Sequence, residues 1–140
     1  MKILLAVDGS PYTKKMLAYL ATHIEMFGAG NRFTLLNVQL PLPPRARAAV
    51  GADVAKSYHD EEAAKVFGPV TKFLKRHGVD AETISKVGHP GELIAKTADS
   101  GKFDMVVMGS HGHSALGNLV MGSVATKVMA HCGTPVLLVR

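Results

Sequence analysis

The chain has 140 residues, 47% hydrophobic and 19% charged, which suits a single globular domain over residues 1–140 and excludes a disordered chain. Its one cysteine, Cys132, excludes an intrachain disulfide or a CxxC pair and is interpreted as an ordinary residue at a helix end. The net charge of +5 comes from lysines and arginines spread along the chain, which favours solvated helix faces over a nucleic-acid surface and also suits an anionic small ligand.

The first part of the chain alternates between strand and helix patterns. Residues 2–7 form an apolar run that predicts a strand buried on both faces. Ser10 and Pro11 are a good N-cap and first-turn pair for a helix reaching about residue 26, and Gly28 ends it. Residues 32–40 predict the second strand.

Residues 39–51 have the composition of a long mobile loop. Prolines at 41, 43 and 44 are followed by Arg45 and Arg47. A plain surface loop and a basic lid over a phosphate site both remain open, and the composition favours the plain loop. A second helix is expected over about residues 52–76, with Gly78 beyond it.

The remaining elements continue the alternation. Residues 81–87 predict a third strand that alternates Ile84 with charged neighbours, as an edge strand does, and a third helix starts at Pro90. Residues 103–108 predict the fourth strand. The last helix is expected to end near His131 with Val120, Val124 and Val128 on one face, before a fifth strand over residues 136–139.

This alternation predicts an α/β fold, with a doubly wound, five-stranded parallel sheet of order 3-2-1-4-5 and helices on both faces, as in Rossmann-like proteins. The apolar runs are far too short to span a bilayer. The first run is closed by Asp8 with no small-residue cleavage site after it, so we expect no signal peptide, no membrane insertion and a cytoplasmic protein.

The segment from Gly109 to Ser123 carries the chemistry. It holds four glycines, which let backbone approach a ligand closely and allow positive φ angles, and it leads into a helix start that attracts anions. Phosphate binding is one interpretation. Simple turns, or close helix packing at Gly122, are the other. The segment is neither a Walker A loop nor a GxGxxG fingerprint.

Asp8 adds a second element to this site. In the predicted sheet the first and fourth strands are neighbours whose connections leave on opposite faces, so Asp8 and Gly109 should face each other across a crevice. The Asp8 carboxylate has two open roles there, accepting hydrogen bonds from ribose hydroxyls or helping to cap the first helix.

The spacing Gly109-x2-Gly112-x9-Gly122-Ser123 resembles the Gly-x2-Gly-x9-Gly-(Ser/Thr) pattern of the universal stress protein family. The likeness extends over the whole chain, from the opening residues 3–10 to the closing residues 133–140. It implies a nucleotide-binding α/β fold, and in ATP-binding members the residue matching Asp8 contacts the ribose region while that matching Val38 lies by the adenine.

The same resemblance implies that the glycine segment holds ribose and phosphates. The predicted nucleotide-binding residues are Ala6, Val7, Asp8, Val38, Met108, Gly109, Gly112, His113, Gly122, Ser123 and Val124. The implied ligand is ATP, with ADP or AMP as competitors and Mg²⁺ arriving with the nucleotide. The implied assembly is a homodimer through the otherwise exposed last strand, Val136, Leu137, Leu138 and Val139.

The chain departs from the family pattern at His113, where many members carry arginine. A neutral imidazole gives a phosphate less charge than a guanidinium, so triphosphate binding should be weaker, or pH-dependent below about 7. The histidine pair His111 and His113 also keeps open a slow ATPase or phosphate-transfer enzyme, although no metal-binding carboxylate cluster, Walker lysine or nucleophile–base pair accompanies it.

Two histidines are too few for a resident metal site. The sequence therefore favours a nucleotide-binding regulatory protein with an unknown protein partner. An enzyme and a ligand-independent interaction module are the alternatives.

Overall fold

The computed structural model describes residues 1–28, 30–113 and 120–140. The elements, in chain order, are β1 (Lys2–Ala6), α1 (Pro11–Thr22), α2 (Ile24–Phe27), β2 (Arg32–Gln39), α3 (Pro44–Arg76), β3 (Ala81–Val87), α4 (Pro90–Ser100), β4 (Met105–Gly109), α5 (Ser123–His131) and β5 (Val136–Val139). They alternate as the sequence predicts, and the fold is α/β and Rossmann-like.

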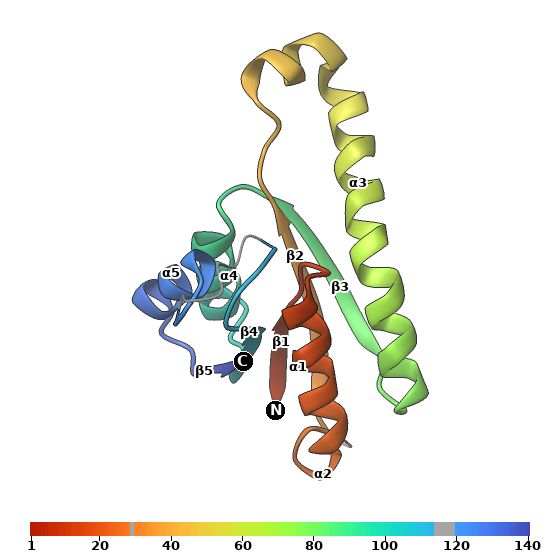
Figure 1. The fold of residues 1–140 in the computed structure, drawn as a ribbon, viewed down its shortest axis with the longest axis vertical. Helices are drawn as coiled ribbons and strands as arrows, with labels where there is room; N and C mark the ends of the chain where they lie inside the picture. The colour runs from red at the N-terminus through yellow and green to blue at the C-terminus, as the bar shows by residue number, and fades with distance from the viewer. Residues whose placement is uncertain (29, 114–119) are drawn as a thin grey trace.

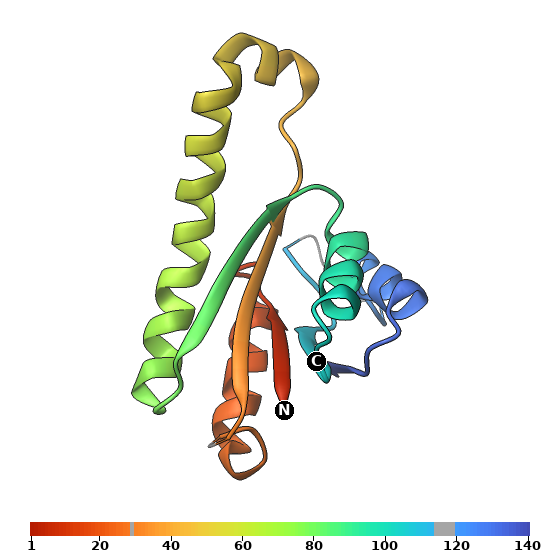
Figure 2. The same ribbon diagram turned by 180° about the vertical axis from the view of Figure 1, so that it is seen from behind.

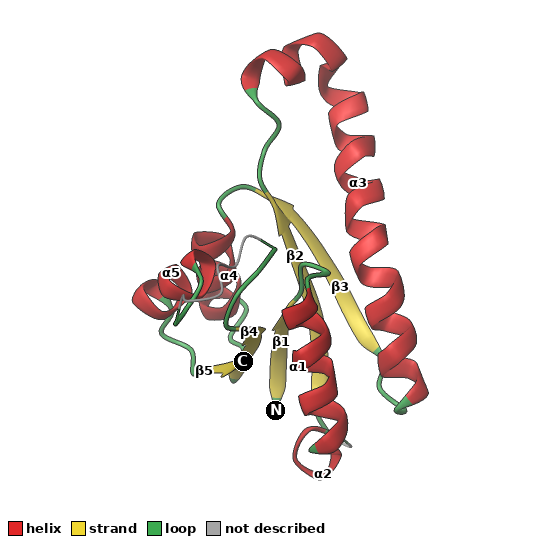
Figure 3. Ribbon diagram, viewed as in Figure 1, coloured by secondary structure: helices red, strands yellow, loops and turns green. Residues whose placement is uncertain are grey.

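The strands form one parallel sheet in the order β3-β2-β1-β4-β5, which confirms the predicted order (Figure 3). In the centre of the sheet, Ile3 of β1 is paired with Phe33 of β2 on one side and with Met105 of β4 on the other. Parallel neighbours require crossover connections, and the helices between the strands provide them.

Helices cover the two faces of the sheet separately, α1 and α3 on one face and α4 and α5 on the other (Figures 1 and 2). Successive residues of β1 point to opposite faces, so Ile3 and Leu5 belong to the first core and Leu4 to the second. All three are fully buried, and burying each such side chain contributes about 1.5–3 kcal/mol.

The first helix is shorter than predicted, because α1 ends at Thr22 and a separate single turn, α2, follows His23. The Thr22 hydroxyl donates to the carbonyls of Ala18 and Tyr19, and the His23 ring nitrogen Nδ1 lies 2.8 Å from the Tyr19 carbonyl oxygen. Side chains that bond to the backbone in this way compete with the next helical turn.

The loop prediction for residues 39–51 is wrong over residues 44–50, which are helical. Pro44 occupies the first helical turn, where its fixed φ is already suitable, and good helix formers follow it. Gly51, with φ 82° and ψ 168°, then bends the chain into the long part of α3. The N-terminal part of α3 extends beyond the end of the sheet (Figure 1).

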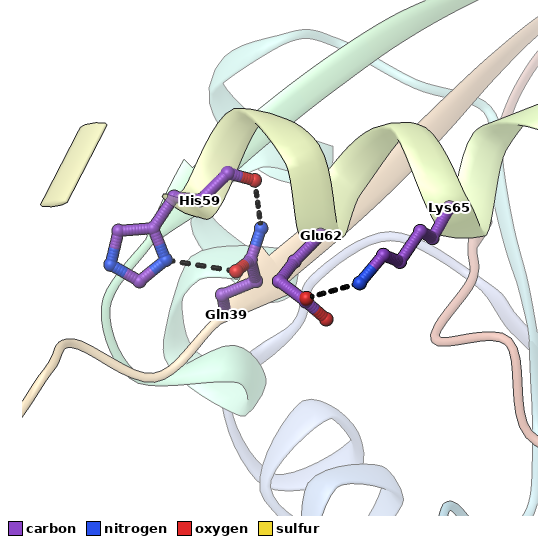
Figure 4. Close-up of polar contacts among 4 residues, drawn as sticks. All are labelled: Gln39, His59, Glu62 and Lys65. Carbon is purple, nitrogen blue, oxygen red and sulfur yellow. Dashed lines mark hydrogen bonds and ion pairs between the residues drawn. The ribbon is translucent and has the colours of Figure 1, made fainter. Parts of the chain in front are cut away.

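A side-chain clasp holds α3 against the end of β2 (Figure 4). The Gln39 amide nitrogen donates to the His59 carbonyl oxygen at 2.7 Å, and His59 Nδ1 donates to Gln39 Oε1 at 2.8 Å. One turn further along α3, Glu62 and Lys65 form a partly exposed ion pair at 2.9 Å, which contributes little stability. The clasp therefore anchors this part of α3.

Two boundaries near the C-terminus also differ from prediction. β4 begins at Met105, not residue 103, and α5 begins at Ser123. Val120 therefore lies outside the last helix, 75% exposed, whereas Val128 is buried. None of the helices that the structure describes is long and apolar enough to cross a membrane.

Candidate functional site

A cavity of about 340 Å³ opens at the carboxyl ends of β1 and β4. It lies at the switch point of the sheet, because the chain leaves β1 for α1 on one face and β4 for α5 on the other. All eleven residues predicted to bind nucleotide line it: Ala6, Val7, Asp8, Val38, Met108, Gly109, Gly112, His113, Gly122, Ser123 and Val124. The structure thus brings together residues from three distant parts of the chain, while their contact with a ligand stays a prediction.

The cavity also has a lining that the sequence analysis missed. Leu36 and Leu40 flank Val38 at the strand spacing of two, and this periodicity is the signal that could have found them. Pro90 and Ile94 come from the start of α4, and no local pattern identifies them, since α4 reaches the cavity only through packing over the sheet. Thr13 and Ala125 were also missed, and His111, considered from the sequence only as part of a possible enzyme, lines the cavity as well.

Asp8 contributes one carboxylate oxygen to the turn into α1. Its Oδ1 accepts hydrogen bonds from the Ser10 backbone N–H at 2.9 Å and from the Thr13 hydroxyl at 3.0 Å. Its Oδ2 faces Gly112, since a β-carbon added there would lie 2.9 Å from that oxygen. Oδ1 therefore supports the turn that leads into α1 without capping a backbone N–H inside the helix, and Oδ2 is on the loop side.

The motif glycines allow close packing rather than unusual backbone angles. Gly109, Gly112 and Gly122 do not adopt the positive φ angles that glycine allows. A β-carbon at Gly109 would lie 2.6 Å from Tyr12 Cβ, and one at Gly122 would lie 3.1 Å from His111 Cα. These glycines therefore let the loop fold tightly against α1 and against itself. The fourth glycine, Gly117, lies outside the described residues.

The first turn of α5 faces the cavity. Gly122 is its N-cap, and Gly122, Ser123, Val124 and Ala125 all line the space. The Gly122 N–H donates to the Ser110 carbonyl at 2.7 Å, which fixes the helix start against the end of β4. The first backbone N–H groups of a helix lack helical acceptors and favour an anion near them.

Two histidines stand at the polar side of the cavity. His113 Nε2 lies 2.7 Å from the Asp8 carbonyl oxygen and ties the glycine loop to the end of β1. His111 Nδ1 lies 2.8 Å from the Ser110 hydroxyl, and the His111 ring packs on Tyr12 with centroids 4.8 Å apart.

Arg45 and Arg47 do not line this cavity, so the basic-lid interpretation is wrong for the arrangement observed. Within residues 1–28, 30–113 and 120–140, no group of three or more His, Cys, Asp and Glu side chains could hold a metal ion.

Comparison with known proteins identifies the family of the chain. A model of the universal stress protein family matches residues 1–140. The chain belongs to that family. Among universal stress proteins, it is 33% identical over 138 residues to one from Thermus aquaticus, covering 99% of this chain and 97% of the relative.

Other universal stress proteins are longer than the region they share with this chain. Slr1230 of Synechocystis is 32% identical over 139 residues, which is 99% of this chain but 42% of the Synechocystis protein. The chain thus spans less than half of that relative, and nearly all of the Thermus one.

Solved structures show the same fold. The structure of MJ0577, a universal stress protein of Methanocaldococcus jannaschii, superposes with a TM-score of 0.82 at 28% identity, covering 99% of this chain and 94% of that one. A universal stress protein of Archaeoglobus fulgidus was solved in complex with dAMP, with a TM-score of 0.67 at 22% identity, covering 100% and 98% of the two chains. An Arabidopsis thaliana family member was solved with AMP bound, with a TM-score of 0.68 at 19% identity, covering 99% and 90%.

Proposed function

We propose that this universal stress protein binds an adenine nucleotide in the switch-point cavity, with ATP as the first candidate and ADP or AMP as alternatives. The proposal rests on one observation, that the cavity lining has an apolar part and a part rich in backbone N–H groups. Leu36, Val38, Leu40 and Ile94 give an apolar surface suited to a base, while the glycine loop and the start of α5 give backbone N–H groups suited to phosphate.

Size and chemistry both support this ligand class. A volume of about 340 Å³ lies within the range of small-molecule sites, at its lower end. Asp8 also lines the cavity, and its carboxylate is a suitable acceptor for ribose hydroxyls. The structures solved with AMP and dAMP share this fold. Mg²⁺ would accompany a bound triphosphate.

We propose a regulatory role for the bound nucleotide, in which occupancy shifts contacts with a second copy or a protein partner. β5 is paired with β4 on one side and ends the sheet on the other, and Val136, Leu137 and Leu138 are only partly buried. An edge strand of this kind is a template for pairing with a second chain, so we propose a homodimer through β5. A cytoplasmic location belongs to the same proposal.

The decisive experiment has two steps. Purified protein is denatured and its released small molecules are identified, and the protein is then titrated calorimetrically with ATP, ADP and AMP. Heat from at least one nucleotide at a single site per chain is the expected result. No released nucleotide, and no heat at millimolar concentrations, would leave a ligand-independent interaction module as the function.

A slow ATPase or phosphate-transfer enzyme is the second candidate, because His111 and His113 both line the polar side of the cavity. Its signature is turnover that follows the protein through several columns and disappears in a His111→Ala, His113→Ala variant. Turnover that varies between preparations, or survives in that variant, counts against the enzyme.

A further inference from the structure

We infer that His113 is a phosphate-selecting residue that donates a hydrogen bond to a bound phosphate only when its ring is protonated. The inference rests on the proposed nucleotide site and assigns its specificity to one side chain. His113 lines the cavity from the glycine loop, between Gly112 and the start of α5.

The hydrogen bond to Asp8 fixes the neutral form of the His113 ring. Nε2 lies 2.7 Å from the Asp8 carbonyl oxygen, and a carbonyl oxygen can only accept. Nε2 must therefore carry the hydrogen. A neutral imidazole has one N–H, so Nδ1 then presents a lone pair. In this state His113 has no second hydrogen to give to an anion, and its lone pair repels a phosphate oxygen.

Protonation changes Nδ1 without disturbing the bond to Asp8. It adds a hydrogen and a positive charge at Nδ1, while Nε2–H continues to donate to the carbonyl. The loop can therefore keep its position while the ring changes from acceptor to charge-assisted donor. Arginine or lysine at this place would donate at every physiological pH, whereas histidine does so over part of that range.

Few other titratable groups face His113. The Asp8 carboxylate stands across the loop, with Oδ1 bonded to Ser10 and Thr13 and Oδ2 towards Gly112. On the same loop is His111, whose ring packs on Tyr12 of α1, and Lys15 Nζ lies 4.6 Å from the centroid of that tyrosine ring. The residues of α4 and α5 that line the cavity are not titratable. Residues 114–119 have no titratable side chain in the sequence.

The consequence is a preference for phosphorylated ligands that grows as pH falls. ATP should gain affinity from His113 on going from about pH 8 to about pH 6. Adenosine has no phosphate and should gain nothing. Phosphate itself takes up a proton near pH 6, which works in the opposite direction, so the comparison must be made against a variant with a neutral side chain.

The test uses calorimetry on the full chain with ATP and with adenosine at about pH 6 and about pH 8. His113→Gln keeps an amide donor for the Asp8 carbonyl but never becomes charged, and His113→Arg is always charged. His77→Gln is the matched control, because that ring bonds the Phe73 carbonyl at the end of α3, away from the cavity. Circular dichroism and thermal unfolding verify that each variant is folded.

We expect wild-type ATP affinity to rise about tenfold relative to His113→Gln on going to the lower pH, the size of one charge-assisted hydrogen bond. His77→Gln should follow wild type, and His113→Arg should bind ATP well at both values. Equal pH dependence in wild type and His113→Gln would overturn the inference, as would adenosine that follows pH as ATP does. Failure of both ligands to bind at either pH would instead refute the proposed function itself.

Two measurements test the inference without relying on a variant. Nitrogen NMR of the free protein at about pH 8 should show the His113 ring with its hydrogen on Nε2, and a hydrogen on Nδ1 would contradict the starting point. Titrations in buffers of different ionisation enthalpy near pH 7 should show that ATP binding takes up a proton that adenosine binding does not. Equal uptake for the two ligands would place the protonated group elsewhere.

Discussion

Replacing Gly122 by valine tests how the glycine loop is built. A β-carbon at this position would lie 3.1 Å from His111 Cα and 3.2 Å from the Ser110 carbonyl oxygen. Both are backbone atoms, so neither can rotate away, and valine adds two methyl groups beyond the β-carbon. The sequence alone suggests only that the valine side chain would occupy the space of a bound phosphate. The structure instead directs the new side chain against the backbone of the loop.

The magnitude follows from overpacking. Inserting carbons into a tightly packed place typically costs about 1–3 kcal/mol, and here the loop must move to relieve the contact. The same movement displaces Ser110, whose carbonyl fixes the helix start, and also His111 and Gly112, which line the cavity. We expect the free energy of unfolding to fall by about this amount, with the fold retained, and nucleotide affinity to fall at least about tenfold.

Chemical denaturation gives the stability change, and calorimetry with ATP gives the affinity. Gly122→Ala should produce a smaller loss of both, because alanine makes the β-carbon contact alone. Gly68→Ala is the control, since Gly68 is an exposed residue of α3 whose added β-carbon meets no atom within 4 Å. Wild-type stability and wild-type affinity in Gly122→Val together would refute this account of the loop.

Three further predictions concern other parts of the molecule. Leu138→Pro should give a monomer in light scattering, whereas Leu138→Ala should stay a dimer. The carbonyls of Pro135 and Val139 accept hydrogen bonds from β4 and its end, and backbone groups alternate along a strand, so the Leu138 N–H points to the open edge of the sheet, where proline would remove it. A proline variant that remains dimeric would exclude pairing through β5. Gln39→Leu should lower the free energy of unfolding by about 1–3 kcal/mol because it leaves Nδ1 of the buried His59 ring without its acceptor, and adding His59→Leu should cost less than the sum of the two single changes. Additive losses in chemical denaturation would show that the two side chains do not act as a unit. Hydrogen bonds from the Gly133 backbone, and then from the Thr134 hydroxyl, lower the pKa of Asp99 below its usual 3.8, so the ionised Asp99 stabilises the fold above pH 3.8 and this stabilisation is lost as the pH falls through the lowered value. Asp99→Asn should therefore melt at a lower temperature than wild type at neutral pH, and the difference in melting temperature should close below about pH 4. A difference that does not change with pH would contradict this prediction.

Most of the fold could be predicted from the sequence because its signals are local. The apolar runs of the central strands, the Ser10-Pro11 helix start and the glycines after helices each depend on a few adjacent residues. The helix over residues 44–50 was missed because three prolines suggest a loop, although Pro44 stands at the one helical position that tolerates it. The end of α1 at Thr22 depends on side-chain bonds to the backbone that composition does not specify.

The candidate site could also be predicted only in part. The spacing of Gly109, Gly112, Gly122 and Ser123 identified the loop, and the order of the strands placed Asp8 beside it, so all eleven predicted residues line one cavity. Pro90 and Ile94 escaped prediction, because whether the start of α4 reaches the cavity depends on how that helix packs on the sheet.

The sequence by itself therefore determined the strand order, the family and the segments that meet at the switch point, since periodicity and motif spacing are written along the chain. Only the tertiary structure decided what each group does there. In the folded chain, Oδ1 of Asp8 bonds at the start of α1, and the motif glycines pack closely against Tyr12 and against the loop backbone. The Asp8 carbonyl fixes the hydrogen of neutral His113 on Nε2. The physical reason is distance along the chain: Asp8 and His113 are 105 positions apart, and a hydrogen bond between them exists only once the sheet has brought β1 and β4 side by side.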